Sequence, residues 1–255
     1  MPSTGAELPA KTAWRGSRGT HDLDRYLYGT LAGILGLLVV AGFARTYYLK
    51  VLFATPPLPS LVVHAHGVVM TAWVVLFSVQ VGLVSTRRVR VHQRLGYLGI
   101  GLAVLVIVMG VWTALGAARH GSTSTPTGFS QPTFSIVPLG DMLLFTLFFG
   151  GAVHFRRTPR RHKGLMFLTV VNFLPPAIGR LPITLVQAHP VLFGLGVPAG
   201  LASAGLAIDT WRHGRMDRLL LAAVLFFIAS FPGRIALMAT PARARASAWL
   251  AALVD

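Results

Sequence analysis

Histidine and aspartate side chains inside apolar segments are the residues of this chain whose types could support chemistry. His64 and His66 lie one residue apart in the apolar stretch Leu61–Gln80, and Asp141 is the one acidic residue well inside an apolar block. Imidazole and carboxylate groups bind zinc, and a catalytic zinc site uses three such ligands and an open position. His64, His66 and Asp141 are therefore candidate metal ligands, and a membrane-embedded metal-dependent hydrolase is one hypothesis.

The spacing of the two histidines argues against a shared metal ion. Each step along an α-helix turns the side chain by about 100°, so His64 and His66 point to nearly opposite sides. His66 belongs to a stripe with helical spacing that predicts a face looking into the protein. The alternative is a histidine satisfied by a backbone carbonyl or a neighbouring polar side chain. The other members of the stripe are Met70, Trp73, Phe77 and Gln80.

Two basic segments of the chain are similar to each other. The first reads RRVRVHQRLGYLG from Arg87 to Gly99, and the second reads RRTPRRHKGLMFL from Arg156 to Leu168. Each has paired arginines, then a histidine, and then a leucine three residues after that histidine. This pattern predicts two copies of one helical hairpin, related by an axis along the membrane normal. It places His92 and His162 at equivalent helix ends.

Two histidines on facing helices of a bundle are the ligand set of a bis-histidine haem. His92 and His162 are the candidate pair, and His66 is a third candidate ligand. The chain contains no cysteine, which excludes covalent haem attachment, so the cofactor would be haem b. The alternative is that each histidine lies at the membrane interface and reaches for lipid phosphate.

Asp141 has two interpretations. In the first turn of a helix, the helix dipole would favour its charge; otherwise it forms an ion pair with Arg180 or Arg234. Each of these arginines follows a proline-containing segment near the end of an apolar stretch, where snorkelling to headgroups also explains it. Together with Asp141 and the two histidines of the first apolar stretch, these arginines could line an outward-facing polar pocket. Its candidate members are His64, His66, Asp141, Arg180 and Arg234.

Hydrophobic residues make up 54% of the 255 residues and charged residues only 12%, whereas soluble domains carry about 25% charged residues. The composition predicts an all-α, polytopic membrane helical bundle. The net charge of +16 comes from arginines beside apolar segments, which contact anionic lipid headgroups, so we expect no nucleic-acid partner. We expect residues 1–25 to be a cytoplasmic polar tail, 26–239 the transmembrane bundle, and 240–255 an outer tail or interfacial helix.

A helical span needs about 20 apolar residues, and about seven segments qualify. The sixth segment contains Pro198. The alternative is therefore a bundle of six spans with a re-entrant segment at that position. We expect spans two to five to form a four-helix core. The positive-inside rule places the Arg-rich loops and the N-terminus in the cytoplasm, and we expect a bacterial inner (plasma) membrane. The predicted spans are Tyr26–Phe43, Ser60–Ser85, Leu95–Ala118, Leu139–Phe155, Gly164–Ile183, Val191–Ile208 and Leu219–Ala239.

Across Leu61–Leu181, about half of the chain, the pattern resembles a family of uncharacterised bacterial multispan membrane proteins, catalogued as a domain of unknown function. It is similar, more weakly, to haem-carrying four-helix membrane cytochromes. The resemblance implies fold and membrane location, and it brings no established activity. The residues that carry it are His66, Gln80, Arg88, His92, Leu95, Gly96, His162, Leu165, Met166, Arg180 and Leu181.

These observations leave several function classes open. One is a redox protein that holds haem b or passes electrons to quinone. A second is a non-catalytic accessory subunit that assembles with partner membrane subunits. A third is a small transporter whose fifth span, broken by Pro175 and Pro176, is the binding element. The metal-dependent hydrolase is a fourth class, and the chain lacks the second histidine pair inside a span that such a site would need.

Overall fold

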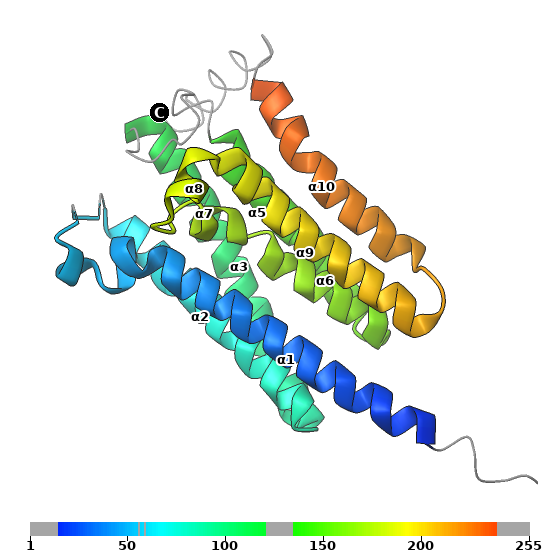
Figure 1. Cartoon of the computed structure of the whole chain (residues 1–255). Coiled ribbons are helices and arrows are strands. Elements are labelled where there is room, and N and C mark those ends of the chain that lie inside the picture. Colours follow the sequence, from blue (N-terminus) through cyan, green and yellow to red (C-terminus); the bar gives the residue numbers. More distant parts are fainter. Residues whose placement is uncertain (1–14, 56, 59, 121–134, 239–255) are drawn as a thin grey trace, which may run out of the picture.

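The computed structural model describes residues 15–55, 57–58, 60–120 and 135–238. These residues form helices and turns, and none of them forms a strand, so the predicted all-α class is confirmed for the described chain (Figure 1). The expected outer segment 240–255 and the first part of the expected N-terminal tail lie outside the described residues.

The helices follow the apolar segments of the sequence closely. Helix α2 differs from its predicted span by one residue at its start, and α10 by one residue at each end. Helix α1 begins eleven residues before the predicted first span, inside the expected tail. The long helices are α1 (Arg15–Phe43), α2 (Leu61–Ser85), α3 (Val89–His120), α5 (Ile136–His154), α9 (Pro190–His213) and α10 (Arg218–Met238). The shorter elements are η1 (Ala44–Tyr48), η2 (Lys50–Phe53), α6 (Pro159–Val171), α7 (Leu174–Ile178) and α8 (Thr184–Ala188).

Six helical segments in the described residues are long and apolar enough to cross a membrane. By the length and composition of its helices, this is a multi-pass membrane protein. The predicted fifth span is not a continuous helix, because α6 ends at Val171 and α7 begins at Leu174. The sixth predicted span stays helical through Pro198, so the interruption lies one span earlier than the six-span alternative assumed. The six segments are Gly29–Tyr48, Leu61–Ser85, Val89–Ala118, Ile136–His154, Pro190–His213 and Arg218–Met238.

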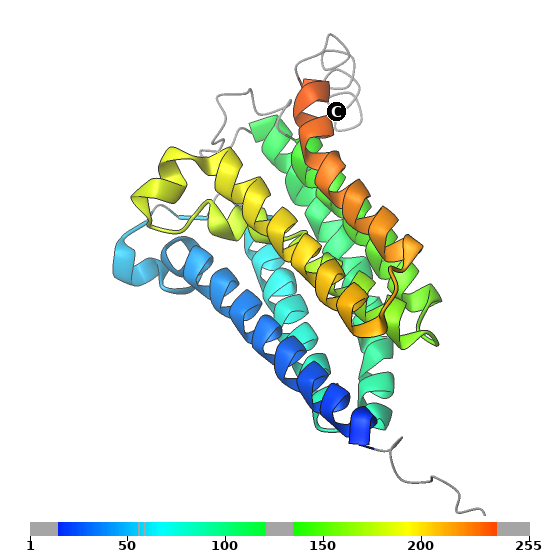
Figure 2. The same cartoon turned by 45° about the vertical axis from the view of Figure 1, so that its right-hand side comes forward.

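The turns that carry most of the described arginines lie at one end of the bundle. They join α2 to α3, α5 to α6, and α9 to α10, and both views show them toward the lower end with the start of α1 (Figures 1 and 2). We call this the Arg-rich end and the other the far end. Helix α6 starts at the Arg-rich end, while α7 packs against the last turns of α1 at the far end, where a Cβ at Gly42 would collide with the Ala177 backbone.

The second half of helix α6 is deeply buried in the bundle. Its residues Leu165 and Phe167–Val171 are all buried, and they form the centre of the larger hydrophobic cluster with side chains from α1, α5, α7, α8, α9 and α10. A second cluster joins α2, α3 and α5 around Trp73, Val106 and Phe145. The expected core of spans two to five is therefore incomplete, because α1, α9 and α10 also close around α6.

Candidate functional site

The rings of His92 and His162 face each other at the Arg-rich end. Their centroids are 6.2 Å apart and the ring planes are inclined by 79°. Each histidine is the fourth residue of its helix, α3 for His92 and α6 for His162. The backbone N–H groups donate to equivalent carbonyls, Arg88 at 3.1 Å and Thr158 at 3.0 Å. The two residues therefore occupy the equivalent positions that the repeat predicts, and the fold brings them into contact.

The hydrogen bond at His162 determines which of its nitrogens carries the proton. Nδ1 lies 2.8 Å from the Ala152 carbonyl oxygen. A carbonyl oxygen can only accept, so Nδ1 is the donor and Nε2 of a neutral ring keeps its lone pair. The ring is thus held by α5 and offers Nε2 as an acceptor or a metal ligand.

His92 is held by Gln80 of α2. In the amide orientation that satisfies both groups, Gln80 Nε2 donates to His92 Nδ1 at 2.6 Å and to the His92 carbonyl at 3.2 Å. Gln80 Oε1 then accepts from the Gly96 N–H at 3.2 Å. This arrangement, inferred from the surrounding donors and acceptors, puts the His92 proton on Nε2. Turning the amide over would present Oε1 to a protonated Nδ1 and free Nε2 as a ligand, but it would also set Oε1 against the His92 carbonyl and the amide N–H groups against the Gly96 N–H.

The three candidate metal ligands have separate surroundings. His64 stacks on Tyr47 with ring centroids 5.7 Å apart, and the Tyr47 hydroxyl donates to the His64 carbonyl at 3.2 Å. His66 is half-buried with no hydrogen-bond partner for Nδ1. The described residues contain no cluster of three His, Asp or Glu side chains suited to a metal ion. The two-residue spacing on α2 separates the histidines, and Asp141 is engaged elsewhere.

Asp141 forms a buried ion pair with Arg234 of α10. Nη1 of Arg234 lies 2.6 Å from Asp141 Oδ1, and both side chains are 11% exposed. The same Nη1 donates to the Val137 carbonyl at 2.6 Å, and Nε donates to Ser230 at 3.2 Å. Asp141 lies beyond the first turn of α5, which contains no acidic residue. Of the two interpretations, the structure therefore has the ion pair, with Arg234 as partner.

Arg180 does not join that ion pair. Its Nη1 donates to the Pro176 carbonyl at 2.8 Å, and its guanidinium lies 5.0 Å from the centroid of the Phe43 ring. The expected outer pocket of His64, His66, Asp141, Arg180 and Arg234 is thus divided. His64 contacts Tyr47, Arg180 contacts α1 and α7, and only Asp141 and Arg234 contact each other.

The sequence interpretation missed Asn172, at the break between α6 and α7. Its side chain is fully buried, and Nδ2 donates to the Asp141 backbone carbonyl at 2.9 Å. Its Oδ1 has no partner, and neither does the buried Trp73 Nε1. The available signal was an amide residue three positions before Pro175-Pro176 in an apolar segment.

Two aspartates after the sixth predicted span also went unnoticed. Asp209 is buried and pairs with Arg160 at 2.7 Å, while Asp217 pairs with Arg161 at 2.8 Å. Burial by itself raises the pKa of Asp217, but the Arg161 guanidinium and the N–H groups of Leu219 and Leu220 outweigh it, so this pKa lies below its usual value. These two carboxylates neutralise the positive charges of Arg160 and Arg161, which follow the α5–α6 turn.

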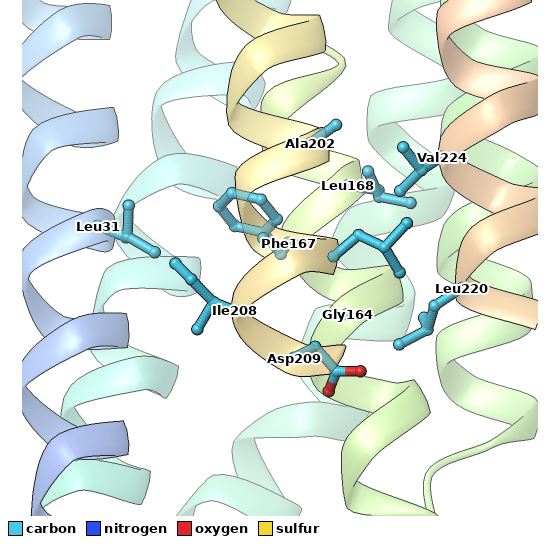
Figure 3. A pocket seen from close by; sticks show the side chains of 11 residues that line it. Leu31, Gly164, Phe167, Leu168, Ala202, Ile208, Asp209, Leu220 and Val224 are labelled. Carbon is cyan, nitrogen blue, oxygen red and sulfur yellow. The ribbon is translucent and has the colours of Figure 1, made fainter. Parts of the chain in front are cut away.

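A small cavity lies between α1, α6, α9 and α10, with a volume of about 30 Å³. Figure 3 shows apolar side chains around it, including Leu31, Phe167 and Val224, with Asp209 at the Arg-rich end. A cavity of this size has room for about one or two water molecules and not for an organic cofactor. This cavity is therefore not a candidate cofactor site.

Comparisons of this chain with families of proteins, with curated proteins and with solved structures find no match.

Proposed function

We propose that this protein binds b-type haem with His92 and His162 as axial ligands and takes part in electron transfer in a bacterial inner membrane. The ring spacing carries the proposal. A histidine nitrogen binds a metal ion at about 2 Å, so one ion could hold both rings if their nitrogens turned toward each other. The observed separation is 6.2 Å.

The contacts around His162 fit metal ligation, and those around His92 fit it only with the Gln80 amide turned over. Ligating histidines commonly donate their other N–H to a carbonyl or an amide oxygen, which orients the ring. His162 has this contact with Ala152, and His92 gains it when the Gln80 amide presents Oε1 to Nδ1. Helices α3 and α6 are not among the extensively packed pairs, so the rings approach from two separated helices. When bound, haem would supply one-electron chemistry at its iron.

The position of the pair suits the acidic edge of the cofactor. Haem carries two propionate groups, and arginines bind carboxylates well. Arg87, Arg88, Arg90 and Arg94 are exposed around the α2–α3 turn, and Arg88 lies one turn before His92. The positive-inside rule puts this end in the cytoplasm, where the same arginines would also contact anionic lipid headgroups.

An absorption spectrum of the detergent-purified chain, with haem quantified per polypeptide, tests the proposal. We expect a Soret band and one haem per chain, both lost in His92→Ala and His162→Ala. His64→Ala is the matched control, because His64 contacts Tyr47 instead, and it should keep the spectrum. A colourless protein from haem-replete cells, or full haem content in the His92→Ala/His162→Ala double variant, would reject the proposal.

A small carrier is the second candidate function, and the discontinuity between α6 and α7 favours it. Secondary transporters place substrates and coupling ions at broken helices inside the membrane. Here the residues on both sides of the interruption belong to the larger hydrophobic cluster. Ion uptake into proteoliposomes that contain the purified protein tests this function, and the same vesicles without protein are the control.

A further inference from the structure

Two backbone carbonyls at the end of α6 lack their helical donors for a covalent reason. The carbonyl of residue i in a helix accepts from the N–H of residue i+4. For Val171 and Asn172 those residues are Pro175 and Pro176, which have no N–H. Two neighbouring N–H groups donate to earlier carbonyls, that of Asn172 to Leu168 and that of Phe173 to Val170.

The side chain of Asn172 adds a third acceptor at the same place. Its Nδ2 donates to the Asp141 carbonyl on α5 at 2.9 Å, which fixes the amide orientation. Its Oδ1 therefore points away from that contact, and it has no hydrogen-bond partner. Asn172 and Val171 are both fully buried. A buried polar group without a partner costs free energy, so Asn172 Oδ1 indicates a ligand.

The electrostatics of the break favour a positive ligand. The C-terminal end of a helix carries partial negative charge, and α6 ends at this point. Both arginines that approach the break have acceptors of their own. Arg234 bonds to Asp141, Val137 and Ser230, and Arg180 bonds to Pro176. Neither guanidinium donates to Asn172 Oδ1.

We infer that the α6–α7 break binds a monovalent metal cation through Asn172 Oδ1 and the carbonyl oxygens of Val171 and Asn172. Neutral oxygens suit Na⁺ or K⁺, whereas Ca²⁺ and Mg²⁺ sites rely on carboxylates, and the nearby Asp141 carboxylate is paired with Arg234. Unwound carbonyls and the C-terminal ends of half-helices coordinate ions in carriers. Helix α6 has 13 residues, so the site lies about 20 Å from the Arg-rich end, within the hydrocarbon.

This inference deepens the carrier candidate by naming the ion class, and it is independent of haem. The test is the thermal stability of the purified full-length protein in NaCl, KCl or choline chloride at equal ionic strength. A bound ion stabilises the folded state in a saturable manner. We expect Tm to rise by several degrees with Na⁺ or K⁺ and to stay constant with choline. Radioactive ²²Na⁺ or ⁸⁶Rb⁺ should then bind near one ion per chain.

Two variants make the test specific. Pro175→Ala with Pro176→Ala restores the N–H donors to the Val171 and Asn172 carbonyls, so it should fold and lose the ion response. Asn172→Leu should lose it as well. Gln187→Leu, which removes an exposed amide at the far end, is the control and should keep the response.

Three results would overturn the inference. They are equal Tm in all three salts, an unchanged ion response in the folded proline double variant, or a response to Ca²⁺ alone. Ion binding without uptake into proteoliposomes would support the ion site and reject the carrier function. Failure of the site and failure of the carrier function can therefore be told apart.

Discussion

Arg234 of α10 donates from Nη1 to the Asp141 carboxylate of α5 at 2.6 Å, and each side chain is 11% exposed. Removing one member of a buried pair leaves an uncompensated charge and costs about 3–5 kcal/mol. We therefore expect Arg234→Met to lower the free energy of unfolding by about this amount, measured by denaturant titration in detergent micelles. Arg234→Met with Asp141→Leu should recover much of the loss, and Arg180→Met should cost less. A small effect of Arg234→Met alone would contradict the buried pair.

Gly140 makes room for the Arg234 side chain. A Cβ at this position would collide with the arginine Cδ and guanidinium. We expect Gly140→Ala to destabilise the protein by about 1–3 kcal/mol, the usual cost of overpacking. Gly150→Ala on the same helix is the control, because its Cβ would meet nothing within 4 Å. That variant should be neutral or stabilising by up to about 1 kcal/mol, and equal losses in both variants would exclude the collision.

The pair of Asp217 with Arg161 predicts a loss of stability in acid. Its contacts lower the pKa of Asp217 below the ordinary value of 3.8. A carboxyl with a lowered pKa contributes its full stabilisation above the unfolded value, and that contribution is lost as pH falls through the folded value. Tm measured from pH 6 to pH 2 should thus fall less steeply below pH 4 in Asp217→Asn than in the unchanged protein. Identical profiles would show that the pair has no such role.

Gln80 orients His92, so it should govern how firmly haem is held. Loss of a hydrogen-bond partner of a ligating histidine typically weakens metal affinity about 10–100-fold. We expect this loss in Gln80→Leu, measured as haem transfer to apomyoglobin, and retention in Gln80→Glu, which keeps an acceptor for His92 Nδ1–H. Ser78→Ala is the control, because Ser78 bonds only within α2. Equal haem loss rates in Gln80→Leu and the control would show that Gln80 does not support the ligand.

The proposed orientation of the protein in the membrane can be measured by labelling introduced cysteines. The chain has no cysteine of its own, so there is no background labelling. Arg90→Cys marks the exposed α2–α3 end and Leu52→Cys marks the exposed η2 segment. We expect a membrane-impermeant maleimide to label Leu52→Cys in intact spheroplasts and Arg90→Cys only in inverted vesicles. The opposite pattern would place the Arg-rich end outside and move the proposed haem site with it.

The amino-acid sequence by itself determined the position of most long helices and that six of the described helical segments are long and apolar enough to cross a membrane. The boundaries of α2 and α10 follow from runs of apolar residues, because a lipid-spanning helix requires a local length of hydrocarbon. The stripe from His66 to Gln80 also predicted which face of α2 looks into the protein. In the structure Trp73 contacts α5 and Gln80 contacts α3. The repeated basic segments predicted that His92 and His162 are equivalent.

Only the tertiary structure decided which polar groups meet. It paired Asp141 with Arg234 instead of Arg180, placed α6 at the centre of the bundle, and left Asn172 Oδ1 buried without a donor. These outcomes depend on the rotation of each helix about its axis and on its neighbours. A stripe can indicate which face of one helix looks inward, but no local pattern encodes the partner, because residues such as Asp141 and Arg234 are brought together by packing across the whole bundle.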